Sequence, residues 1–340
     1  MSDTSRHLTY LMLENFKRFE SLEIGALGQF NLIVGDNNVG KTSVLEALLV
    51  DGDCYYSVHR LVTLLRLKKL KSEFVYDDLL LFHNKNSKSK LEKTIFFRLK
   101  FEKSKELNLT LRVDSITGNF AFGPDVKSDG RMVEAHITDI MGINPSIDSP
   151  LILLNQGHDV DLTNFYSKLQ ENRTLKKNFL KNLKSLITNL EDIELSKPYS
   201  NADPHLIVSQ LNLDSTIPLA LFGEGTIRLF RILAHISLNQ GKRLMIDEVD
   251  TGIHYSRMRE FWKVILMAAK ENDVQLFMTT HDQECIKYFK EVLEEELTDY
   301  QNISRSVVLV ENSKTFKVTA HTYSYEELEH AINVGNEIRA

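Results

Sequence analysis

Apolar residues near the start of the chain predict two strands, a loop and a helix. The run 8–19 is apolar enough for one strand, and the run 30–35, FNLIVG, suits a second, buried strand. A glycine-bounded loop follows, and the apolar stretch 43–50 then has the pattern of a helix. A strand that leads through a glycine-rich loop into a helix is the usual setting of a phosphate-binding turn.

The middle of the chain changes from strand patterns to a helical one. Residues 94–102 and 107–113 suit antiparallel strands, and 118–123 offers a third. Residues 125–150 carry Gly, Pro and Asp and are expected to be mostly loop. Apolar residues then recur at spacings of three and four, which predicts one amphipathic helix over about 161–195. These residues are Leu175, Phe179, Leu183, Leu186 and Leu190.

The last third alternates strands with helices. Strands are expected at 205–211, 243–250 and 274–281, and helices at 226–238 and 258–270. Apolar strands that alternate with helices are typical of a parallel sheet covered on both faces. We therefore predict an α/β fold in which antiparallel strands come early, a parallel core sheet is completed late, and a helical arm joins the two.

Composition excludes several classes of function. The chain has 340 residues and a formal net charge of -6, so its whole surface cannot be a cationic coat for nucleic acid. The two cysteines, Cys54 and Cys285, form no CxxC pair, which argues against a zinc site and for a reducing compartment. The start is polar, and no apolar run approaches the roughly 18 residues of a membrane span. A cytoplasmic protein without membrane contact is expected.

The loop after the second strand matches the pattern G-x-x-x-x-G-K-[ST]. Its glycines let backbone N–H groups turn inward around phosphates. Lys41 would supply positive charge at the β- and γ-phosphates, and Thr42 would offer a hydroxyl to Mg²⁺. The residues expected to bind nucleotide are Gly35, Asp36, Asn37, Asn38, Val39, Gly40, Lys41, Thr42 and Ser43.

Two later strands end in residues that suit hydrolysis. RLMIDEVD places Asp247 and Glu248 where the apolar strand ends, at the sheet edge where α/β proteins bind ligands. Asp247 would hold Mg²⁺, and Glu248 would act as the general base on water. His281 ends the next strand and would lie at the same edge if the two strands are neighbours. The alternatives are a solvated acidic strand end and a structural histidine.

The order of these motifs resembles that of ABC-type ATPases, which include transporter motors, chromosome-maintenance proteins and recombination ATPases. NFKRFESLEIGALGQFNLIVGDNNVGKTS and MIDEVDTGIHYS are similar to segments of the stand-alone bacterial branch related to the overcoming-lysogenization-defect ATPases. The resemblance implies a P-loop NTPase fold with two lobes in a single domain, 1–340. The N-terminal lobe would span about 6–125, the arm about 158–200 and the C-terminal lobe about 205–325.

The resemblance also implies a signature loop that reaches the γ-phosphate bound by a second copy. Gly223, Glu224 and Gly225 occupy that place, but without the serine of the transporter sequence Leu-Ser-Gly-Gly-Gln. Thr226 or backbone N–H groups would have to substitute, and the alternative is a simple helix cap. Aspartate at Gly225 is expected to weaken association and leave folding intact. The family's lever-loop glutamine has two candidate positions, around Phe82-His83-Asn84 and at Gln156, and the choice stays open.

The function implied is an ATP-hydrolysing dimeric switch with ATP and Mg²⁺ as cofactors. It would control a separate effector, a nuclease or toxin, or a transaction on DNA or RNA, in bacterial antiphage defence. The alternative is a nucleotide-dependent scaffold with negligible turnover. A transporter motor is disfavoured by the altered signature. About sixty residues follow His281, too few for the nuclease domain of the longer relatives, so the effector is expected on another chain.

The predicted arm is rich in basic residues, which are Lys168, Arg173, Lys176, Lys177, Lys181 and Lys184. A basic helix of this kind can contact nucleic acid or a partner protein. The more ordinary interpretation is a solvated face.

Overall fold

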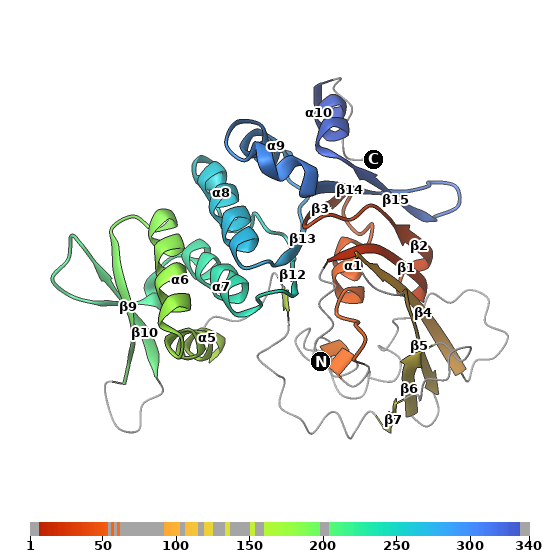
Figure 1. Cartoon of the computed structure of the whole chain (residues 1–340), viewed down its shortest axis with the longest axis horizontal. Helices are drawn as coiled ribbons and strands as arrows, with labels where there is room; N and C mark the ends of the chain where they lie inside the picture. Colours follow the sequence, from red (N-terminus) through yellow and green to blue (C-terminus); the bar gives the residue numbers. More distant parts are fainter. Residues whose placement is uncertain are drawn as a thin grey trace. The chain divides into compact units, whose positions relative to one another are not determined.

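The computed structural model describes residues 7–53, 56–57, 60–61, 92–102, 106–114, 119–124, 133–136, 150–153, 160–197 and 204–333 (Figure 1). The chain forms two compact units. The first unit comprises 1–151 and 303–340, and the second unit comprises 152–302. Both candidate lever-loop positions, Phe82-His83-Asn84 and Gln156, lie outside the described residues.

An antiparallel sheet dominates the first unit, with strand order β2-β1-β4-β5-β6-β7. Phe16, Phe97 and Phe122 from three of its strands pack edge to face in the core. The single strand expected over 8–19 is wrong, because the chain reverses at Lys17, whose φ is 49°, and forms a hairpin. The strands are β1 (Leu8–Phe16), β2 (Phe19–Ile24), β4 (Glu92–Phe101), β5 (Leu107–Asp114), β6 (Asn119–Pro124) and β7 (Val133–His136).

The first unit also contains β3 (Phe30–Gly35), which leads into α1 (Lys41–Ala47). Every residue of β3 is buried, as expected of a strand covered on both faces. Its parallel neighbour is β14 (Ser304–Glu311), which pairs on its other side with the antiparallel β15 (Val318–Tyr323). The helix α10 (Tyr325–Asn333) follows β15.

The second unit is built on the parallel pair β12 (Arg243–Ile246) and β13 (Gln275–Thr279). Beside β12 lies the short strand β8 (Leu151–Ile152), whose Ile152 carbonyl accepts a bond from the Asp247 N–H. Three long helices accompany these strands, and Trp262 of the second helix donates to the Cys285 carbonyl and stacks edge to face on Phe289. The helices are α7 (Glu224–Leu238), α8 (Tyr255–Glu271) and α9 (Gln283–Glu295), with 3₁₀ turns at Leu219–Leu221 and Thr298–Ile303.

The arm of the second unit differs from the single helix expected over 161–195. It contains two helices and a sheet, because Asn172 leaves helical geometry and caps a new helix by accepting from the N–H groups of Thr174 and Leu175. The Tyr166 hydroxyl donates to the Ile193 carbonyl and ties the first helix to the sheet. The elements are α5 (Val160–Gln170), α6 (Arg173–Leu186), β9 (Leu190–Ser196), β10 (His205–Gln210) and β11 (Ile217–Pro218). None of the described helices has the length and apolar character needed to cross a membrane.

Candidate nucleotide-binding and hydrolysis site

The loop between β3 and α1 needs glycine at two places. Gly35 and Gly40 have φ of 146° and 107°, which side chains rarely adopt. A Cβ at Gly35 would lie 2.6 Å from the Leu309 carbonyl oxygen, and one at Gly40 would lie 2.6 Å from Phe19 Cζ. Asn38 also has positive φ, 65°, a conformation that asparagine tolerates better than most residues. The loop is therefore held in a tight turn that other residues at these positions would open.

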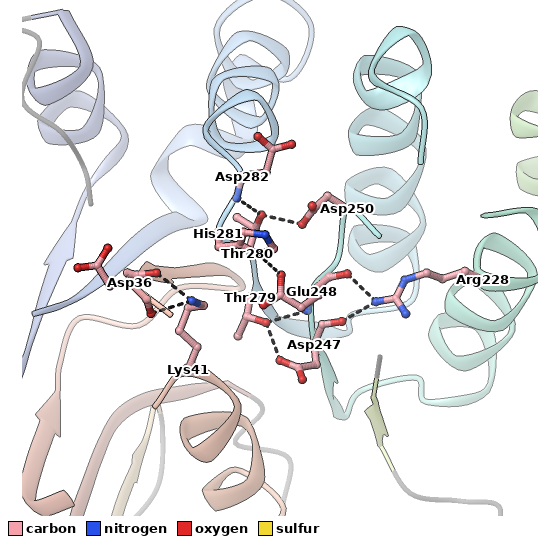
Figure 2. A network of polar contacts seen from close by, with 11 residues as sticks. Asp36, Lys41, Arg228, Asp247, Glu248, Asp250, Thr279, Thr280, His281 and Asp282 are labelled. Carbon is pink, nitrogen blue, oxygen red and sulfur yellow. Dashed lines mark hydrogen bonds and ion pairs between the residues drawn. The ribbon is translucent and has the colours of Figure 1, made fainter. Parts of the chain in front are cut away.

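Lys41 is the first residue of α1, and its ammonium group turns back onto the loop (Figure 2). Its Nζ donates to the carbonyls of Gly35 at 2.8 Å and Asp36 at 3.1 Å. The residue is only 6% exposed, so its charge is largely withdrawn from solvent. A buried cation directed at backbone carbonyls of a phosphate-loop sequence can also bind phosphate oxygens that enter the loop.

In the second unit, Thr279 connects the two acidic residues that follow β12. Its hydroxyl donates to Asp247 Oδ1 at 2.8 Å and accepts from the Glu248 N–H at 2.8 Å (Figure 2). Thr279 is the last residue of β13, and β13 runs parallel to β12. Pairing of the two strands therefore sets the position of the Asp247 side chain and of the Glu248 backbone.

Glu248 has a left-handed backbone with φ of 48°, which is uncommon for a residue other than glycine. Such outliers cluster at functional sites because the surrounding contacts must hold them. Its Oε2 lies 2.5 Å from His281 Nδ1, and the side chains are 18% and 53% exposed. The carboxylate and the imidazole thus form a hydrogen-bonded pair that water can reach. A pair of this kind can take up a proton from a bound water molecule.

His281 lies between two residues that hold its backbone. Thr280 donates its hydroxyl to Asp250 Oδ1 at 2.6 Å and accepts from the Asp282 N–H at 3.0 Å. Asp282 in turn caps α9 by accepting from the Glu284 N–H. The turn that carries His281 is therefore fixed from both sides.

Arg228 is a component of the site that sequence patterns do not identify. It lies on α7, and its Nη2 donates to the Asp247 carbonyl at 2.5 Å and to the Glu248 carbonyl at 2.7 Å (Figure 2). Burial lowers the pKa of this guanidinium, against the opposing effect of the Asp247 and Asp250 charges. The sequence offers no signal that singles out Arg228, because α7 also contains Arg231 and His235 among its apolar residues. Arg228 links the helix after the signature loop to the backbone that carries Glu248.

The signature loop forms the start of α7. Gly223 is the N-cap residue, and a Cβ there would meet no atom within 4 Å. Gly225 is different, because a Cβ at this position would overlap the Gly252 carbonyl oxygen. The expectation that aspartate at Gly225 leaves folding intact is therefore wrong. Glu224, the first helical residue, is exposed beside Gly223.

The second unit brings Asp247, Glu248 and His281 together, and the phosphate loop lies in the first unit. Among the described residues, no three His, Cys, Asp or Glu side chains form a metal-binding cluster. Mg²⁺ in phosphate-loop proteins is held by one or two protein oxygens together with substrate phosphates. The hydroxyl of Thr42 and the carboxylate of Asp247 have the ligand chemistry that such an ion requires.

Comparison with known proteins gives three findings. A family model described as AAA domain, putative AbiEii toxin, type IV TA system, matches residues 30–286. A Helicobacter pylori protein named ATP/GTP phosphatase is 24% identical over 375 aligned positions, which cover 94% of this chain and 96% of that protein. A structure titled as the Smc head bound to the C-winged helix domain of ScpA superposes with a TM-score of 0.62 at 15% identity, covering 96% of this chain and 99% of that one.

A second solved structure supports the same fold. It is an Smc head domain with a coiled coil and joint derived from Pyrococcus yayanosii. The TM-score is 0.57 at 9% identity, and the match covers 97% of this chain and 100% of that one. These likenesses show an α/β fold of the two-lobed, ABC-type P-loop kind, as the sequence motifs predict.

Proposed function

The chain belongs to the AAA domain family of the putative AbiEii toxin, and from this premise we propose that it is an ATP-hydrolysing switch that works as a dimer. Its fold is that of P-loop ATPase domains. In the proposed reaction, Lys41 neutralises charge on the β- and γ-phosphates, and the glycine-bounded loop holds the phosphate oxygens through backbone N–H groups. Mg²⁺, when bound by Thr42 and Asp247, would offset the charge that develops on those phosphates.

The observation that carries this proposal is the position of Glu248. Its backbone N–H donates to Thr279, its carbonyl accepts from Arg228, and its carboxylate contacts His281. A carboxylate with this support can accept the proton of an attacking water, while His281 holds the carboxylate in place through its Nδ1. The proposal requires the loop and this acidic edge to act on one nucleotide, as in ABC-type ATPases.

The dimeric part of the proposal rests on the exposed start of α7. Gly223 is open to solvent, and Leu221, two residues before it, is 75% exposed. The backbone N–H groups at a helix N-terminus attract anions. We propose that the signature loop of one copy, Gly223-Glu224-Gly225, meets the γ-phosphate bound by the other copy. ATP with Mg²⁺ would then hold the two copies together.

A separate effector protein is proposed as the partner of the switch. The family description names a putative toxin of a type IV toxin–antitoxin system, and one solved relative is an Smc head bound to a domain of another protein. Both facts are consistent with an ATPase that controls a companion nuclease or toxin. We propose antiphage defence as the setting of that control.

The test is phosphate release from ATP by wild type and by Glu248→Gln. The amide keeps the size and the hydrogen bonding of the carboxylate but cannot accept the proton, so turnover should fall by about 10²-fold or more. ATP binding, measured by calorimetry, should persist, and the ATP-bound variant should accumulate as a dimer. Equal turnover of variant and wild type would exclude Glu248 as the base.

The alternative function is a scaffold that binds ATP and scarcely hydrolyses it. The observation in its favour is the signature loop, which lacks the serine hydroxyl found in transporters. The same assay separates the two functions. Wild-type turnover that Glu248→Gln abolishes supports the switch, and dimerisation by ATP without measurable turnover supports the scaffold.

A further inference from the structure

The charge of α6 differs sharply from that of the rest of the chain. The helix RTLKKNFLKNLKSL contains basic side chains and no acidic one, in a chain whose formal net charge is -6. One side of α6 is anchored, because Phe179, Leu183 and Leu186 are buried. The other side is therefore presented on a rigid, packed element and carries a local excess of positive charge.

The solvent face of α6 contains only basic and small polar residues. Every exposed position of the helix is arginine, lysine, threonine, asparagine or serine. These positions are Arg173, Thr174, Lys177, Asn178, Lys181, Lys184 and Ser185. All five residue types are the ones that proteins use to contact the phosphates of nucleic acids.

Four of these side chains form a stripe, Arg173, Lys177, Lys181 and Lys184, which is called the basic stripe below. Their spacing of four, four and three residues keeps them on one side of a helix over about 16 Å. Within the described part of the chain, no ion pair joins a side chain of the basic stripe to a carboxylate.

Two acidic residues of the neighbouring strand β9 act on Tyr166. Together with burial, which is the larger cause, the charges of Asp192 and Glu194 raise the pKa of Tyr166. Lys176 lies over the ring of the same tyrosine, 5.5 Å from its centroid, and is not part of the basic stripe. The carboxylates of Asp192 and Glu194 thus act on the tyrosine that Lys176 covers.

We propose that the basic stripe of α6 binds the phosphodiester backbone of a nucleic-acid duplex. A duplex carries one charge per roughly 1.7 Å of its axis, so a stripe of this length faces several phosphates. The exposed face has no aromatic residue on which an unpaired base could stack, which disfavours single strands. It also has no aromatic or large apolar anchor of the kind that dominates protein interfaces.

Binding of this kind is independent of base sequence and strongly dependent on salt. If all four side chains of the basic stripe contact phosphates, the slope of log K against log salt is about −3.6. Affinity for duplex DNA should then fall roughly 100-fold between about 50 and 200 mM salt. The inference goes beyond ATP hydrolysis and does not depend on it, so binding is measured without nucleotide.

The experiment measures the fluorescence anisotropy of a labelled DNA duplex titrated with the full chain. The stripe variant is Lys177→Gln/Lys181→Gln/Lys184→Gln. The matched control, Lys242→Gln/Lys287→Gln/Lys314→Gln, removes the same charge from three exposed lysines elsewhere. We expect the stripe variant to lose affinity about tenfold or more and its salt slope to fall by about 3, while the control binds as wild type does. Thermal melting of both variants verifies that they are folded.

Titrations with duplex RNA and with single-stranded DNA show which kind of nucleic acid the basic stripe binds. If the stripe variant loses the same affinity for duplex DNA as for duplex RNA, the stripe recognises the backbone alone. If the two losses differ, the larger one identifies the preferred duplex. Tighter binding of single-stranded DNA than of duplex would overturn the proposal. Equal affinity of the stripe and control variants would also overturn it, and so would a wild-type chain that binds no duplex at about 50 mM salt.

Discussion

Arg228 is the residue on which the geometry of the acidic edge depends most directly. Its Nη2 bonds to two consecutive carbonyls, those of Asp247 and Glu248, at the point where Glu248 takes up its left-handed conformation. A guanidinium can bridge two acceptors in a fixed fork, and an ammonium offers only a point charge. Arg228 is therefore a positioning residue, which acts on Glu248 through the backbone.

Replacing Arg228 with Gln should lower kcat for ATP hydrolysis by roughly 10- to 100-fold, because the base moves relative to the water. KM should change little, since the phosphate loop is untouched. Arg228→Lys should recover part of kcat because one carbonyl keeps a charged donor.

The control for the Arg228 variants is Arg257→Gln. This change also removes a guanidinium bond to a backbone carbonyl, that of Leu186, elsewhere in the second unit. If loss of such a bond only destabilises the fold, Arg228→Gln and Arg257→Gln should lower the melting temperature by similar amounts. If kcat of the Arg257 variant falls as much as that of Arg228→Gln, the role of Arg228 is structural only.

At the scale of elements, two glycines at the start of α7 have different surroundings, although they look equivalent in the sequence. Gly223 is open and precedes the helix, whereas Gly225 packs against the backbone of Gly252. Aspartate is a favourable N-cap residue, because its carboxylate accepts from free N–H groups of the first turn. A negative charge can therefore be introduced into the signature loop by substituting Gly223, but not by substituting Gly225.

Gly223→Asp should keep the melting temperature of the monomer or raise it slightly, because aspartate at an N-cap is worth only about a few tenths of a kcal/mol more than glycine in unfolding free energy. It should also weaken ATP-dependent dimerisation, because its carboxylate repels the γ-phosphate in a desolvated interface. Gly225→Ala should instead lower the melting temperature. Light scattering with ATP and Mg²⁺ checks the first variant, and dimerisation equal to that of wild type would contradict the proposed interface.

At the scale of the whole molecule, the phosphate loop and the signature loop belong to different units of the chain. Lys41 lies in the first unit, and Gly223 lies in the second. In a two-fold dimer with shared sites, each site takes its loop from one copy and its signature from the other. Such a division can be tested by complementation.

Mixing Lys41→Ala with Gly223→Asp in equal amounts should restore roughly a quarter of wild-type turnover. If the protein is concentrated enough for all copies to pair at random, half of the dimers combine the two variants, and each of these has one intact site out of two. Each variant alone should be nearly inactive. The measurement is phosphate release before and after mixing. If mixed dimers form but turnover is not restored, the signature loop acts within its own chain or serves only as a helix cap.

The sequence by itself indicated the residues that we propose carry the chemistry. The glycines and Lys41 of the loop, the acidic pair after β12 and His281 are candidates on sequence alone, because each lies where a short local pattern ends. The structure brings Glu248 and His281 into contact. The α/β class could also be predicted, since apolar periodicity is a local property of the chain. The helix break at Asn172 was missed, because its capping bonds compete with a continuous apolar pattern.

Only the tertiary structure decided which distant segments meet. The return of β14 to pair with β3 joins residues 274 positions apart, such as Ser304 and Phe30, and no local pattern encodes that register. The same holds for Arg228, Thr279 and Gly252, whose importance lies in contacts with the backbone of other elements. Such contacts depend on where packing places a helix or a strand, so they become visible only when the chain is folded.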